Sequence, residues 1–286
     1  MSPVPLPAVV SDQWLAERLG TPGLIVLDAS WYLPAMARDP QAEYAAGHIP
    51  GARFFDLDAA SDRDTSLPHM LASEAAFGSY VGNLGIGNDA DIVVYDGSGV
   101  NLSAARVWWM FRVYGHDRVA VLDGGAKQWQ AAGRPFVADV SVVAPCEFSA
   151  RLDRARVCGL TQMDAAIGDA SVQIVDMRSA GRFEGRDPEP RPELSSGHMA
   201  GARNLPFVEL VGPDGRLLQS EALRERISRA GVALDRPIIA TCGSGTSACA
   251  FLLALEHLGM APASLYDGSW TQWAGAARPI VKGPAV

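Results

Sequence analysis

One stretch near the C-terminal end decides how the fold of this chain is interpreted. It reads Ile238-Ile239-Ala240-Thr241-Cys242-Gly243-Ser244-Gly245-Thr246-Ser247-Ala248. A short apolar run, typical of a buried strand, ends at Cys242, and a loop of small residues then opens an apolar helix. In such a unit the loop amides and the positive end of the helix dipole meet at one point and stabilise an anion. The group at that point is a thiol, so the stretch predicts that Cys242 is a reactive nucleophile.

The loop after the cysteine is suited to holding an anion. Gly243 and Gly245 let the backbone curl with its amides inward at little steric cost. Together with Thr246 and Ser247, they are predicted to form a cradle around the sulfur and the substrate.

The composition is that of a globular protein with one large or two ordinary domains. The chain has 286 residues, of which 48% are hydrophobic and 20% are charged. Its apolar stretches are too short to span a bilayer, and its formal net charge of −8 argues against a general nucleic-acid binder. We therefore expect neither a membrane nor a nucleic acid as a partner.

The cysteines indicate a reducing compartment. They stand at positions 146, 158, 242 and 249, and they form neither CxxC pairs nor a disulfide framework. Residues 1–10 lack the basic cluster of a signal peptide. We therefore expect a cytoplasmic protein with reduced thiols.

The chain repeats one succession of segments. Apolar runs typical of strands cover 24–28, 91–95 and 118–122 in the first half, and 173–176 and 237–241 in the second. Helical patterns cover 73–84, 103–114, 219–231 and 246–258. The motif AGHIPGA at 46–52 returns as SGHMAGA at 196–202. A repeat this long indicates two copies of a domain, each predicted to be a small parallel α/β sheet with helices on both faces.

The two copies differ where chemistry is expected. The predicted boundaries are 1–140 for the first domain, 141–160 for a linker and 161–286 for the second domain. Residues present in both copies, such as His48 and His198, are predicted to have a structural role. At the loop after the third strand, however, the first copy has Asp96 and the second has Cys242. Because a carboxylate cannot act as a sulfur nucleophile, only the second copy is predicted to be catalytic.

These motifs resemble the tandem-domain rhodanese family of sulfurtransferases over nearly the whole chain. The resemblance implies two rhodanese-like α/β domains and a transferable sulfur carried on Cys242 as a persulfide. The loop CGSGTS is similar to the CGSGVT form of the 3-mercaptopyruvate branch, from which it departs at Thr246 and Ser247. The thiosulfate branch typically has cationic residues directly after the cysteine, where this chain has Gly243 and Ser244.

The segment GRFEGRDPEPRPE resembles one that binds the substrate in the mercaptopyruvate branch. The match implies that Arg182 and Arg191 grip the carboxylate and the keto oxygen, for which guanidinium geometry is suited. Ordinary charged residues on a solvated loop are the alternative. Arg186 has no family counterpart and is expected to lie at the surface.

A proton relay is also implied by the resemblance. The family's FFDxD and HML segments appear here at 54–58 and 69–71, which places Asp58 and His69 beside Ser244 in a relay. The alternative for Ser244 is an ordinary small loop residue. Spacing alone does not distinguish the two, because the three residues are far apart in sequence.

The sequence thus favours a sulfurtransferase that moves sulfur from 3-mercaptopyruvate to a thiol or cyanide and releases pyruvate. A small dithiol such as thioredoxin is the expected acceptor, and the chemistry needs no metal or organic cofactor. Two alternatives stay open: a thiosulfate sulfurtransferase on the same scaffold, and a non-catalytic binding module. A cysteine phosphatase is excluded because its Cys-x5-Arg motif would need arginine where Ala248 stands.

Overall fold

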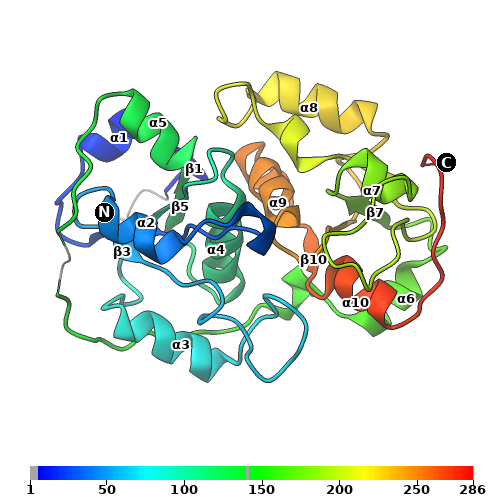
Figure 1. Cartoon of the computed structure of the whole chain (residues 1–286), viewed down its shortest axis with the longest axis horizontal. Coiled ribbons are helices and arrows are strands. Elements are labelled where there is room, and N and C mark those ends of the chain that lie inside the picture. Colours follow the sequence, from blue (N-terminus) through cyan, green and yellow to red (C-terminus); the bar gives the residue numbers. More distant parts are fainter. Residues whose placement is uncertain (1–5, 140–141, 286) are drawn as a thin grey trace. The chain divides into compact units, whose positions relative to one another are not determined.

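The computed structural model describes residues 6–139 and 142–285, which form two units (Figure 1). The first unit comprises the chain up to Arg63, Leu71–Asp153 and Gly212–Leu217. The second comprises Asp64–Met70, Arg154–Val211 and the chain from Leu218 onward. Each half of the sequence therefore contributes one short segment to the unit that the other half mainly builds.

The first unit is built on a parallel sheet of five strands, in the order β1-β5-β4-β2-β3. The strands are β1 (Val9–Val10), β2 (Leu24–Asp28), β3 (Arg53–Phe54), β4 (Asp91–Tyr95) and β5 (Val119–Leu122). The three longer strands were predicted from their apolar runs. They pair in the middle of the sheet, where both faces are covered and apolar residues are needed throughout.

Helices cover both faces of this sheet. The helices are α1 (Asp12–Ala16), α2 (Pro40–Ala46), α3 (Glu74–Asn83), α4 (Leu102–Val113) and α5 (Gly125–Ala131), with a 3-10 turn η1 (Pro34–Met36). Leu15 of α1 and Trp129 of α5 pack with Val93 and Tyr95 on one face. Because side chains alternate along a strand, Ile92 and Val94 of β4 point to the other face, where α4 packs against β4 and β5.

The second unit repeats the architecture, with the strand order β6-β10-β9-β7-β8. Its strands are β6 (Val157–Cys158), β7 (Gln173–Asp176), β8 (Arg203–Asn204), β9 (Ile238–Thr241) and β10 (Ser264–Tyr266). Its helices are α6 (Leu160–Ala166), α7 (Ala180–Glu184), α8 (Ser220–Arg229), α9 (Ala248–His257) and α10 (Ser269–Gly275), with 3-10 turns η2 (Arg154–Arg156) and η3 (Phe207–Leu210). Met163, Trp270 and Trp273 fill the core beneath α6 and α10, while α9 packs against β9 and η3. The predicted pair of parallel α/β domains is thereby confirmed.

The repeated histidines have matching surroundings in the two units. His48 stacks on the ring of Tyr44, and its Nδ1 lies 2.9 Å from the Tyr44 carbonyl oxygen. His198 stacks on Phe183 and lies at the same 2.9 Å from the Phe183 carbonyl oxygen. Both histidines are buried, so they serve packing and turn geometry in each copy.

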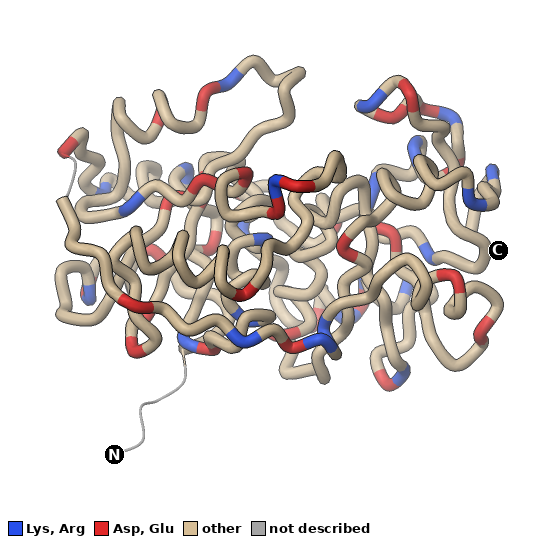
Figure 2. The backbone as a smooth tube through the Cα atoms, turned by 90° about the horizontal axis from the view of Figure 1, so that it is seen from below, with Lys and Arg blue, Asp and Glu red and all other residues tan. Residues whose placement is uncertain are grey.

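Basic and acidic residues are interspersed along the backbone of both units (Figure 2). No helix in residues 6–139 and 142–285 is long and apolar enough to cross a membrane.

The stretch predicted as a linker, 141–160, contains η2 and β6 within its described part, and Phe148 there is buried.

Candidate active site

Cys242 directly follows β9, the central strand of the second sheet. In open parallel sheets, ligands bind at the carboxyl ends of the strands, and this cysteine lies at that edge. Its side chain is buried, and α9 begins six residues later with the loop between them. The strand–loop–helix unit predicted from the sequence is therefore present.

The first turn of α10 is hydrogen-bonded to the loop that follows Cys242. The amides of Trp270 and Thr271 donate to the carbonyl oxygens of Cys242 and Gly243, each at 3.0 Å. The Thr271 hydroxyl adds a 2.7 Å hydrogen bond to the Gly243 oxygen. Since N–H and C=O point in opposite directions across a trans peptide, the amides of Gly243 and Ser244 point away from α10. These bonds hold the backbone in the orientation that an anion cradle requires.

The two loop glycines have different steric roles. Gly245 has a φ of +78°, in the left-handed region that side chains with a Cβ rarely adopt. A Cβ on Gly243 would lie 3.0 Å from Nη2 of Arg182, so a larger residue there would push the guanidinium away. The missing side chain thus brings the predicted substrate-binding Arg182 against the cysteine loop.

A buried carboxylate network positions Arg182. Glu189 accepts hydrogen bonds from Nε and Nη2 of Arg182, and it also pairs with Nη1 of Arg178 at 2.7 Å. Arg178 is fully buried, pairs with Asp176 at 2.6 Å and stacks 4.1 Å from the centre of the Trp270 ring. Burial by itself would lower the pKa of Arg178, but the two carboxylates raise it on balance. Arg178 therefore stays charged, and the network fixes one side of the site.

The other predicted substrate-binding side chains lie at the edge of the network. Arg191 is half-buried, and its side chain has no hydrogen bond or ion pair with the residues that the structure describes. The hydroxyls of Ser244 and Ser247 are likewise unpaired within the described chain, and Ser247 does not cap α9 through its side chain. Their predicted contacts with a substrate stay predictions. Arg186 is exposed and pairs with Glu184, as expected of a surface residue.

The predicted relay residues are distributed over both units. His69 belongs to the second unit, where its Nδ1 lies 3.1 Å from Oγ1 of Thr246. Asp58 belongs to the first unit, where Trp31 Nε1 donates to it at 3.1 Å. The structure thus brings His69 to the cysteine loop, and the hydroxyl it places on the imidazole is that of Thr246. The pairing of His69 with Asp58 and with Ser244 stays a prediction.

The loop of the first unit holds an anion of its own. The Asp96 carboxylate accepts hydrogen bonds from the amides of Ser98 and Ala104, both at 2.8 Å, and from the Ser98 and Ser103 hydroxyls. The adjoining cavity of about 260 Å³ contains Arg38 and Glu43, which pair at 2.6 Å. The first copy therefore has a carboxylate, bound by loop amides, at the position where the second copy has the Cys242 thiol.

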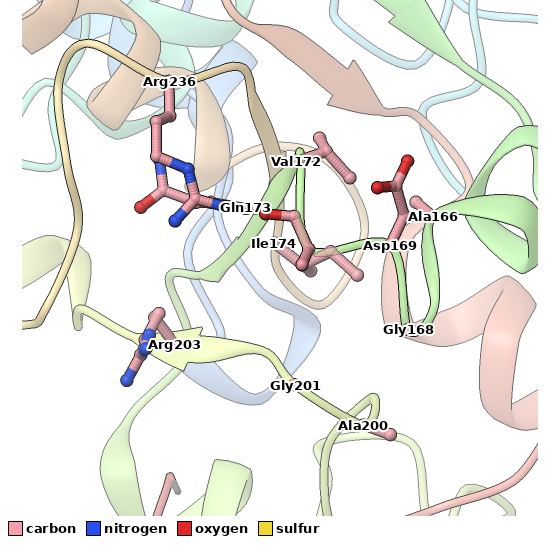
Figure 3. Close-up of a pocket in the computed structure, with 11 residues that line it drawn as sticks. Ala166, Gly168, Asp169, Val172, Gln173, Ile174, Ala200, Gly201, Arg203 and Arg236 are labelled. Atoms are coloured by element: carbon pink, nitrogen blue, oxygen red, sulfur yellow. Dashed lines mark hydrogen bonds between the residues drawn. The ribbon is translucent and has the colours of Figure 1, made fainter.

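A cavity of about 300 Å³ in the second unit lies away from this chemistry (Figure 3). Its lining includes Gln173 at the start of β7, Arg203 at the start of β8, and Arg236, which precedes β9. Because the strands are parallel, this is the amino-terminal edge of the sheet, opposite Cys242. This cavity thus takes no part in the predicted site.

The remaining cysteines have structural surroundings. Cys249 is buried and donates its S–H to the Gly245 carbonyl oxygen at 3.2 Å. Burial raises the pKa of the Cys158 thiol to about 11, which keeps it protonated at neutral pH. Within the described residues, no three His, Cys, Asp or Glu side chains are grouped to hold a metal ion.

Sequence reasoning missed the residues that support the site. Arg178 and Glu189 were not singled out, although Glu189 stands between the two candidate arginines and Arg178 follows a buried strand closely. Thr271 was missed as well. A charged residue two positions after a buried strand was the available signal for Arg178, because such a side chain begins inside the protein and needs a partner.

Comparison with known proteins supports the same assignment. Residues 11–132 and 160–276 match the family described as Rhodanese-like domain. The chain is 42% identical to human 3-mercaptopyruvate sulfurtransferase, over 95% of this chain and 93% of that protein. It is 43% identical to bovine thiosulfate sulfurtransferase, with the same coverage of 95% and 93%. The crystal structure of SseA, a 3-mercaptopyruvate sulfurtransferase from Escherichia coli, superposes with a TM-score of 0.85 at 37% identity and covers 93% of this chain and 99% of that one.

The matched segments fall on the two structural repeats, and the identity extends across nearly the full length of both relatives. The protein belongs to the rhodanese family and carries two rhodanese-like domains in tandem.

Proposed function

We propose that this protein is a 3-mercaptopyruvate sulfurtransferase, which moves sulfur to a thiol or cyanide through a persulfide on Cys242 and releases pyruvate. One observation supports this most directly: the small-residue loop of Cys242 places Arg182 beside Gly243. The site thus combines a nucleophilic thiol with a guanidinium suited to an α-keto carboxylate. The likeness to SseA and to the human enzyme supports the same activity.

The first half-reaction forms the persulfide. The Cys242 thiolate attacks the sulfur of 3-mercaptopyruvate, and the carbon–sulfur bond breaks with its electron pair on the carbon. The leaving group is the enolate of pyruvate, which takes a proton to become pyruvate. Arg182 and Arg191 hold the carboxylate and the oxygen on which negative charge develops. The outer sulfur remains bonded to Cys242, where the loop amides stabilise its charge.

The second half-reaction returns Cys242 to the thiolate. A thiolate acceptor attacks the outer sulfur and leaves with it as a new persulfide. If the acceptor is a dithiol such as thioredoxin, its second thiol displaces hydrogen sulfide and closes a disulfide. Cyanide takes the same sulfur as thiocyanate. We assign the reaction to the cytoplasm, where the free thiols at 146, 158, 242 and 249 would stay reduced; fractionation of cells that express the full chain tests this assignment.

Thiosulfate is the alternative donor, since bovine thiosulfate sulfurtransferase is as similar to this chain as the human enzyme is. A dianion would require cationic side chains at the loop. Positions 243–247 carry none, and Arg182 approaches Gly243 while paired with Glu189. This electrostatic balance favours a donor with one carboxylate.

Turnover of the two donors, measured side by side with a thiol and with cyanide, tests the proposal. A large preference for 3-mercaptopyruvate is expected, together with a Cys242 peptide heavier by one sulfur atom in the absence of acceptor. Equal or better use of thiosulfate would establish the alternative donor. Turnover of neither would leave the chain as a binding module.

The arginine assignments predict a specific loss. Arg182→Lys and Arg191→Lys each remove a bidentate contact worth about 1.5–3 kcal/mol, so kcat/KM for 3-mercaptopyruvate should fall about 10- to 100-fold. Arg186→Lys is the matched control, because Arg186 lies in the same segment but is exposed. The kcat/KM of this variant should stay within about twofold of the parent value. A comparable loss in all three variants would show that the segment acts through its fold alone.

A further inference from the structure

The contact between His69 and Thr246 joins a residue of the first half to the cysteine loop. Nδ1 of His69 lies 3.1 Å from Oγ1 of Thr246, and both side chains are buried. Both residues belong to the second unit. The burial shields this hydrogen bond from competing water, which makes it an effective constraint on the imidazole.

Both partners are held by their backbones. His69 has a φ of +59°, in the left-handed region that a residue with a Cβ adopts only where its surroundings fix it. Thr246 follows Gly245, and its carbonyl oxygen accepts the Cys249 amide at 3.1 Å at the start of α9. Such unfavourable conformations concentrate at functional sites, because they place a side chain where a relaxed backbone would not.

The first half provides a natural comparison for Thr246. Counted from Asp96 and Cys242, the fifth loop residue is Val100 in the first unit and Thr246 in the second. The preceding glycines have nearly equal φ values, +75° at Gly99 and +78° at Gly245. The residues that follow differ in conformation, with a φ of +56° at Asn101 and −71° at Ser247. Valine has the shape of threonine without the hydroxyl and follows the glycine in the first copy, so we expect the second loop to form in Thr246→Val as well.

We infer that Thr246 is a positioning residue for the proposed reaction: its hydroxyl fixes the orientation of the His69 imidazole that delivers the proton to the departing enolate. This inference rests on the proposed function. It differs from the predicted relay because the hydroxyl on the imidazole is that of Thr246 rather than Ser244.

Proton delivery and thiol reactivity can be measured separately. Release of the pyruvate enolate needs a proton on carbon. Alkylation of Cys242 by iodoacetamide expels iodide, which needs none. A residue that only orients the proton donor should affect the first reaction and spare the second, whereas a residue that shapes the loop should affect both.

The test compares Thr246→Val, Thr246→Ser and, as a matched control in the other repeat, Val100→Thr. Single-turnover pyruvate release from 3-mercaptopyruvate should fall about 10- to 100-fold in Thr246→Val, which is less than the full contribution of general acid catalysis of about 100- to 10,000-fold, because the imidazole is still present. The rate of pyruvate release in Thr246→Ser should stay within about threefold of the parent rate, and the rate in Val100→Thr should equal it. The alkylation rate at the Cys242 peptide should be the same in all four proteins. An equal slowing of both reactions, or no change in pyruvate release, would overturn the inference.

A second measurement separates failure of this inference from failure of the proposed function. The ¹⁵N chemical shifts of the His69 imidazole report which ring nitrogen carries the proton, whatever the substrate is. We expect them to differ between the parent and Thr246→Val and to return in Thr246→Ser. Unchanged shifts would overturn the positioning role even in an active enzyme. If the parent does not use 3-mercaptopyruvate, the proposed function fails, while the shifts still decide whether Thr246 orients His69.

Discussion

Replacing Cys242 with serine is expected to abolish sulfur transfer, with a loss of kcat on the order of 10⁶-fold, as for removal of a covalent nucleophile. Serine has nearly the shape of cysteine, and the backbone bonds from Trp270 and Thr271 to the loop do not involve the side chain. The fold should therefore be retained, with a change in unfolding free energy of about 1 kcal/mol or less. Steady-state pyruvate formation and the mass of the Cys242 peptide after donor treatment measure the effect.

Cys249→Ser is the matched control for this substitution. Cys249 is also buried and belongs to the same segment, and its S–H donates to the Gly245 carbonyl oxygen. A serine hydroxyl can make the same bond, so this variant should keep most of its activity. If Cys242→Ser still formed a persulfide, or if only Cys249→Ser failed to form one, Cys242 would not be the residue that carries the sulfur.

The second large effect is expected on stability. Glu189→Gln removes the buried negative charge that lies between Arg178 and Arg182, while the size of the side chain is kept. Loss of one partner of a buried ion pair costs about 3–5 kcal/mol. We expect a value of about 3 kcal/mol, because Arg178 keeps Asp176 as a partner. Urea unfolding monitors the second unit, and KM for 3-mercaptopyruvate should also rise because Arg182 loses its anchor.

Glu184→Gln provides the comparison for Glu189→Gln. Glu184 pairs with Arg186 at 2.6 Å, and the Arg186 side chain is 63% exposed. Exposed ion pairs contribute about 0–1 kcal/mol, so this variant should be nearly as stable as the parent. If the two variants were destabilised to the same small extent, the buried network would not have the structural role assigned to it.

The sequence predicted the centre of each sheet better than its edges. The runs at 24–28, 91–95 and 237–241 could be recognised because a buried parallel strand is apolar at every position. The strands β1, β3, β6 and β8 have two residues each, which is too short to show any periodicity. They form because a neighbouring strand offers backbone hydrogen bonds, and this is a property of the assembled sheet rather than of the local sequence.

For the site, residues within one continuous motif were predictable. Cys242 and its glycines occupy a single loop, and Arg182 follows β7 in the same half. The Glu189 network and the bonds from α10 were missed, because they depend on how separate segments meet in three dimensions. The contact of His69 with Thr246 links residues 177 positions apart in the chain. The difference between Thr246 and the valine of the family loop was visible in the sequence, but not the partner of its hydroxyl.

The short segment 64–70 has a consequence for whether the two halves can be separated. It is encoded in the half that has Asp96 in place of the nucleophile, yet it carries His69 into the unit that contains Cys242. Removal of the first half would therefore also remove His69 from the unit that contains Cys242. A second half produced on its own would thus lack this histidine, whatever the quality of its own fold.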